Sequence, residues 1–232
     1  MVGVKLKSCR IVQWLSSSST WGCSSAFYQL LIGRNYSRVK MSDFLAQSMF
    51  SLGIIKLARS ITELAIAEAN SDYESAVIPL AFLDSIYSSE LVVRASILKI
   101  ELAGNLSTFG ESTVSEIRKI ELINGSSRLS FLELPKELER VSGRLIANST
   151  AYYEMNHLRK ELFSEDFHAN QLVEPTLRFA FESIEPLAID MWGDIILMHI
   201  PELDFEVDKH IETLLAQYDI TASERGDLPE DE

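Results

Sequence analysis

The sequence predicts an all-α fold, an up-and-down helical bundle of about five to six helices. Apolar residues recur at spacings of three and four over long stretches, which is typical of helices with one buried face. Convincing strand alternation bounded by turns is absent from the sequence. Apolar residues make up 47% of the 232 residues, enough for one substantial core. Helices with an apolar face bury it against one another, so the pattern indicates a bundle.

The first long helix is predicted from an N-cap at Ser42 to about Ala69. Its apolar stripe consists of Phe50, Ile54, Leu57, Ile61, Leu64 and Ala65. Gly53 interrupts the stripe and weakens the helix by about 1 kcal/mol relative to alanine. The connection Asn70-Ser71 is very short, so this helix and the next should be antiparallel neighbours or a kinked pair.

The stretch Ser71–Ala103 is apolar around most of a helical circumference, so we expect it at the centre of the bundle. Ser71 followed by Glu74 has the spacing of a capping box. Pro79 should kink this helix or mark its true start. Glu90 and Arg94 are four residues apart in the favourable orientation, and we expect them to pair in a half-buried seam.

Further helices are predicted along the rest of the chain. The long helix beginning at Glu174-Pro175 should kink at Pro186 and stop before Pro201. In chain order, the predicted helices are a short one from Thr113 to about Ile123, one from Pro135 to about Val141, and then Leu145–Phe163, Pro175–Ile200 and Leu203–Tyr218.

The charges divide the chain into three parts. Residues 1–40 hold six basic and no acidic residues, so their net charge is +6, and because the whole chain carries −13, residues 41–232 carry −19. We interpret 1–40 as a poorly ordered basic extension, either a targeting peptide or a segment translated from a start before Met41. Residues 41–218 form the bundle domain, and 219–232 form an acidic tail that we expect to be disordered.

The composition excludes several classes of protein. Both cysteines, Cys9 and Cys23, lie in the basic extension, so residues 41–232 have neither a disulfide framework nor a cysteine-ligated metal. The uncharged run Ile11–Gly33 is too polar to span a membrane, so we expect a cytoplasmic protein without a membrane partner. A body with a charge of −19 disfavours broad nucleic-acid binding, although a local RNA site is compatible with it.

One polar cluster is the candidate for chemistry, because phosphate-binding loops, the nucleophile elbow and HExxH are absent. Glu154, His157 and Glu161 have spacings that place them on one helical face, and Arg159 and His168 are close in sequence. The pair Glu154 and His157 has the Glu-x-x-His spacing of carboxylate-bridged di-iron bundles, but such sites need two pairs and this chain has one. The alternative is a solvated helix end, and no cofactor is predicted.

The segment Ser88–Lys99 resembles the central helix of HEPN-domain proteins, in which a glutamate, apolar residues, a basic residue and an alanine follow a long first helix. Here Glu90, Arg94 and Ala95 occupy these positions. The segment from Leu158 through His168 and on to Ala188 is similar to the end of that bundle. The resemblance covers roughly residues 44–200.

Many HEPN proteins are ribonucleases of toxin–antitoxin or abortive-infection systems that use an R-x4-H motif, often across a homodimer. This chain has no such motif, because the residues five before its histidines are Tyr152, Phe163, Asp194 and Phe205. The resemblance therefore implies a non-catalytic member that acts through protein–protein contacts.

We expect a homodimer, formed through the first and central helices or through Pro175–Ile200, because the bundle has more apolar surface than one core covers. Two enzymatic alternatives stay open. One is a degenerate ribonuclease in which Arg159 acts with His157 or His168, and the other is a metal or small-molecule enzyme within the bundle.

Overall fold

The computed structural model describes residues 38–70, 74–106, 122, 130–143, 149–162, 164, 167–200 and 205–223. In these residues the chain is all-α, with no strand and with six helices when the continuous stretch from α8 to α9 is counted as one, which confirms the predicted fold class. The chain divides into two compact units, Met1–Met41 and Ser42–Glu232, and the second holds the bundle. The predicted extension before Arg38, the capping box at Ser71 and the helix at 113–123, apart from Leu122, lie outside the described residues.

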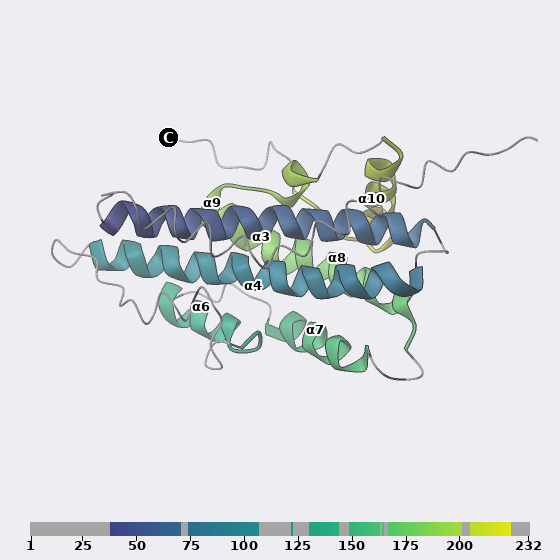
Figure 1. Cartoon of the computed structure of the whole chain (residues 1–232), viewed down its shortest axis with the longest axis horizontal. Coiled ribbons are helices and arrows are strands. Elements are labelled where there is room, and N and C mark those ends of the chain that lie inside the picture. The colour runs from purple at the N-terminus through teal and green to yellow at the C-terminus, as the bar shows by residue number, and fades with distance from the viewer. Residues whose placement is uncertain are drawn as a thin grey trace, which may run out of the picture. The chain divides into compact units, whose positions relative to one another are not determined.

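Helices α3 (Arg38–Glu68) and α4 (Glu74–Leu106) lie side by side and run antiparallel, as the short connection between them predicts (Figure 1). Because α3 begins at Arg38, Ser42 lies inside the helix and is not its N-cap. At Gly53 the two helices approach so closely that a Cβ would lie 2.9 Å from Val92 Cγ2 and 3.0 Å from the Ser88 carbonyl oxygen. Glycine therefore permits this contact, which outweighs its low helix propensity.

Gly53→Ala should destabilise the protein by about 1–2 kcal/mol, although alanine is the better helix former. The added Cβ would meet the α4 backbone, which cannot move aside as a flexible side chain would. Urea unfolding would measure the change, with Ser51→Ala as the control for propensity in the same helix. An increase in the free energy of unfolding for Gly53→Ala would contradict the close contact.

Helix α4 is the centre of the bundle, because it contacts α6, α8 and α9. Its apolar residues are buried along most of its length. The helix starts at Glu74 and runs through Pro79, so the proline does not mark its start. The predicted pair is present: Arg94 Nη2 lies 3.1 Å from Glu90 Oε2, and Arg94 is only 5% exposed.

Within α4, Ala76–Ala103 is long and apolar enough to cross a membrane by length and composition, with a mean hydropathy of 1.5. Within this segment, 56% of the most apolar window is buried inside the fold. The core helix of a soluble protein passes the same test, so this finding is weak evidence for a membrane span.

Helix α8 (Val173–Phe179), a π-helical turn (Ala180–Ile184) and α9 (Glu185–Trp192) follow one another without a break. The π turn ends two residues before Pro186, which has no N–H for a regular helical bond. The predicted end at Ile200 is wrong, because the helix ends at Trp192. Gly193 has φ 61° and its N–H donates to the Ile189 carbonyl at 3.0 Å, so a left-handed glycine closes the helix.

The remaining helices are short and include two 3₁₀ turns. Pro135 lies in the first turn of α6, as predicted, and Gly143 with φ 67° closes that helix. These elements are α6 (Leu134–Ser142), α7 (Ser149–Glu161), η2 (Ala169–Leu172), η4 (Ile196–His199) and α10 (Phe205–Gln217).

Trp192 joins three helices. Its ring stacks on Phe50 of α3 with centroids 4.4 Å apart, and its Nε1 donates to Ser96 Oγ of α4 at 2.9 Å. Lys99 of α4 lies over the same ring, 4.2 Å from its centroid, and donates to the carbonyl of Met191 in the last turn of α9. Burial lowers the pKa of Lys99, and the charge of Asp43 opposes that shift. Lys99 thus serves as a C-terminal cap for α9.

Glu185 is a buried carboxylate that holds two later segments against α9 by hydrogen bonds to their backbone. It is 1% exposed, and its two oxygens accept the backbone N–H groups of Ile196 and Ser223, each at 3.0 Å. Ile220 is also buried. Residues 219–223 of the predicted tail therefore pack on the bundle, and 224–232 lie outside the described residues.

Glu185→Ala should lower the free energy of unfolding by about 3 kcal/mol or more, because two hydrogen bonds to a charged acceptor are lost and two N–H groups lose their partner. Glu185→Gln keeps one acceptor oxygen and should lose less. Thermal or denaturant unfolding would measure both, with the exposed Glu212→Ala as control. Equal stability of Glu185→Ala and the control would show that the two hydrogen bonds of Glu185 contribute nothing to the free energy of unfolding.

Candidate functional site

His157 and Arg159, two of the site residues predicted from the sequence, lie on α7 in different surroundings. The His157 ring is 70% exposed, and its Nδ1 lies 3.3 Å from Glu161 Oε2, one turn further on. Arg159 donates instead to the side-chain oxygen of Asn156 at 2.9 Å. Asn156 is buried, so Arg159 is held against the helix rather than beside a histidine.

His168 lies beyond the end of α7 and is exposed, in extended backbone just before η2. Among the described residues, no hydrogen bond or ion pair joins Arg159 to His157 or to His168. A ribonuclease needs a base and a charge stabiliser within reach of one substrate. The ribonuclease assignment of these three residues stays a prediction.

The metal candidates Glu154 and His157 share α7, and the Glu161 carboxylate lies beside His157. In the part of the chain that the structure describes, no three His, Cys, Asp or Glu residues are close enough to hold a metal ion. A stable site for a transition metal needs three or four such ligands.

A small pocket lies between α7 and α8. Its volume is about 70 Å³, room for a few water molecules and well below the roughly 300 Å³ at which ligand pockets begin. Its lining includes Glu154 and Met155 of α7 and, from α8 and the following π turn, Arg178, Phe179, Glu182 and Ser183. The pocket is too small for a nucleotide or another large substrate.

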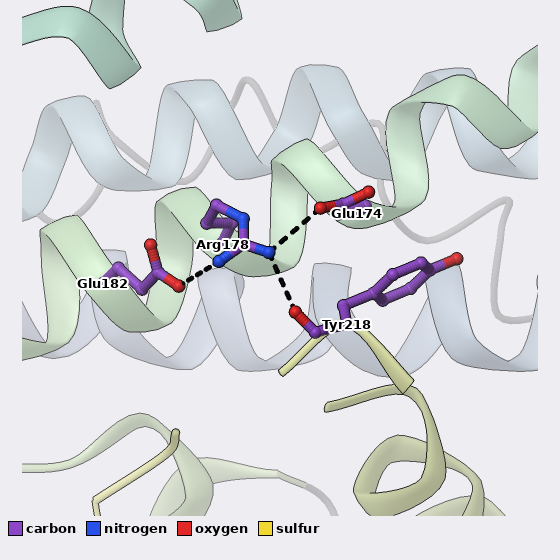
Figure 2. A network of polar contacts seen from close by, with 4 residues as sticks. All are labelled: Glu174, Arg178, Glu182 and Tyr218. Carbon is purple, nitrogen blue, oxygen red and sulfur yellow. Dashed lines mark hydrogen bonds and ion pairs between the residues drawn. The ribbon is translucent and has the colours of Figure 1, made fainter. Parts of the chain in front are cut away.

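Arg178, at the rim of this pocket, is the centre of a polar network that the sequence analysis did not identify. Figure 2 shows its guanidinium between Glu174 and Glu182, with nitrogen–oxygen distances of 3.0 and 2.5 Å. It also donates to the backbone carbonyl of Tyr218 at 2.8 Å. The spacing of four residues from Glu174 to Arg178 and from Arg178 to Glu182 is the sequence feature that could have predicted this network. The network attaches the end of α10 to α8, a structural role.

Two further histidines pair with carboxylates. His199 Nε2 lies 2.8 Å from Asp194 Oδ2 in the turn after α9, and His210 Nε2 lies 2.6 Å from Glu68 Oε2, joining α10 to the end of α3. Both pairs are partly exposed. Each could orient a histidine, but the structure provides no nucleophile in contact with either pair among the described residues.

Tyr152 of α7 is fully buried in an aromatic cluster. Its ring centroid lies 5.0 Å from that of Phe131 and 4.9 Å from that of Phe179. Among the described residues, its hydroxyl has no hydrogen-bond partner. Burial raises the pKa of Tyr152 well above its usual value.

Tyr152→Phe should leave stability at pH 7 unchanged or increase it, since the substitution removes an unpaired buried hydroxyl. Above about pH 10 the unfolded tyrosine loses its proton while the folded one keeps it, so the wild type should lose about 1.4 kcal/mol per pH unit relative to the variant. Urea unfolding from pH 7 to 11 would measure this difference. The exposed Tyr153→Phe is the control, and a parallel pH dependence of wild type and Tyr152→Phe would contradict the burial argument.

The clearest candidate for function is a surface, which we name the α3–α4 face. It is formed by Leu52, Ile55 and Ile66 of α3 with Leu80 and Tyr87 of α4, and each of these side chains is 40–61% exposed. The spacings place the residues of each helix on one side. Lys56 of α3 lies 5.3 Å from the Tyr87 ring centroid, so both helices contribute to the same surface.

Comparison with protein-family models, with curated proteins and with solved structures finds no match to this chain.

Proposed function

We propose that this chain is a non-catalytic, HEPN-like helical protein that acts through protein–protein contacts, the first of them with a second copy of itself. We propose that the protein acts in the cytoplasm, in a toxin–antitoxin or abortive-infection type system like those of many HEPN proteins. The single observation that carries the binding role is the α3–α4 face, because large exposed apolar patches mark interaction sites.

Covering the apolar side chains of this face would offset much of the free-energy cost of association. Full burial of a leucine, isoleucine or aromatic side chain contributes about 1.5–3 kcal/mol, so a half-exposed one contributes about 1 kcal/mol when covered. The five side chains of the face then give about 10 kcal/mol in a symmetric pair of copies. Lost translational and rotational freedom opposes this with about 4–15 kcal/mol. The face brings association close to balance, and the surrounding polar residues decide the affinity.

Electrostatic repulsion between two acidic bodies does not prevent this contact. The net charge of −19 on residues 41–232 is screened beyond about 8 Å at physiological salt. On the face itself, the ion pair of Arg59 with Glu63 at 2.8 Å is internally balanced, and the positive Lys56 is offset by the negative Asp84. The face is therefore less acidic than the body around it.

Glu90 and Arg94, two of the residues that carry the HEPN resemblance, pair within α4 at 3.1 Å. Their side chains bond each other instead of reaching an external substrate, which fits a structural role for the motif.

Leu80→Glu should convert a dimer into a monomer, since Leu80 is 61% exposed on α4 and the change places a charge in the apolar contact. Light scattering after gel filtration at tens of micromolar protein would measure the mass, with twice 26.1 kDa expected for the wild type.

The matched control is Met198→Glu, because Met198 is 51% exposed but lies on η4, outside the face. This variant should remain dimeric. A wild-type protein that elutes with the mass of one chain at low and at physiological salt would refute self-association.

A further inference from the structure

Besides the Arg59–Glu63 ion pair, the α3–α4 face carries one further basic and one further acidic side chain, and their placement specifies how a second copy would dock. Lys56 of α3 and Asp84 of α4 are both exposed. Among the described residues, Lys56 contacts the Tyr87 ring but no carboxylate, and the Asp84 side chain forms no ion pair. Each charge is thus available to a partner.

The two charges lie at about the same level along the helices. Lys56 is beside Tyr87, and Asp84 is one helical turn before Tyr87 on the same side of α4. Gly53, one turn before Lys56, lies against Ser88 and Val92, which fixes the same antiparallel alignment. A partner that presents the same face can therefore reach both charges.

Two symmetric arrangements can lay one such face on another. A twofold axis parallel to the helices places α3 on α4 of the partner copy at the same level, whereas an axis perpendicular to them places α3 on α3 and α4 on α4. In the second arrangement Asp84 meets the exposed half of α4, residues 76–87, which contains no basic residue. In the first it meets α3, which carries Lys56.

We infer that two copies of this chain associate through the α3–α4 face about a twofold axis parallel to the helices, with Lys56 of each copy facing Asp84 of the other. This inference rests on the proposed function, and it adds the symmetry and register of the dimer and the two residues that select them. The symmetry repeats every contact, so the dimer contains the charge pair twice. Complementary charges at the rim of an apolar contact fix register and exclude wrong arrangements.

Charge reversal tests the register. Lys56→Glu gives a copy with acidic residues on both helices, and Asp84→Lys gives a copy with basic residues on both. Each variant alone should dissociate with a constant raised about tenfold or more, because two attractive pairs become repulsive. An equimolar mixture should form heterodimers with the wild-type affinity, and the double variant should form homodimers again.

Light scattering and native mass spectrometry would measure affinity and composition, since the two variants differ in mass. Circular dichroism would confirm that each exposed substitution leaves the fold intact. Unchanged affinity of both single variants, or a mixture that stays monomeric, would overturn the register.

The outcomes separate this inference from the proposed function. If Leu80→Glu dissociates the dimer while both charge variants leave it intact, the face is the interface but the register is wrong. If the wild type is a monomer, the self-association in the proposed function fails together with the register.

Discussion

The close packing of α3 on α4 at Gly53 is the contact on which the rest of the bundle depends. With Val92 and the Ser88 carbonyl oxygen within about 3 Å of where a Cβ would lie, the two long helices meet almost backbone to backbone. This approach aligns Phe50 of α3 with Ser96 and Lys99 of α4, and those three residues receive Trp192 of α9. A wider spacing would separate the residues that hold the third helix.

Buried polar groups then fix the segments that apolar packing alone would leave undefined. Apolar contacts are not directional, whereas a buried carboxylate must accept hydrogen bonds in a definite geometry. Glu185 imposes such a geometry on the backbone at Ile196 and at Ser223, two segments without long helices. Arg178 has the same effect on the end of α10, in a more exposed setting where each ion pair contributes less.

Packing of the described helices leaves an apolar surface exposed beside α3. Helix α4 buries its apolar side chains against α6, α8 and α9 but leaves Leu80 and Tyr87 exposed beside α3. A helix that is apolar on nearly all sides needs neighbours on all sides. The proposed second copy completes the environment that the chain itself provides only in part.

The sequence by itself determined the all-α class, most of the described helices and the internal Glu90–Arg94 pair, because these depend on local spacing and composition. Only the tertiary structure decided the early helix end at Gly193, the role of Gly53 and the partners of Glu185. Each depends on residues distant in sequence or on a backbone angle that no periodicity encodes. Lys56 and Asp84 likewise share one face only because two helices pack antiparallel.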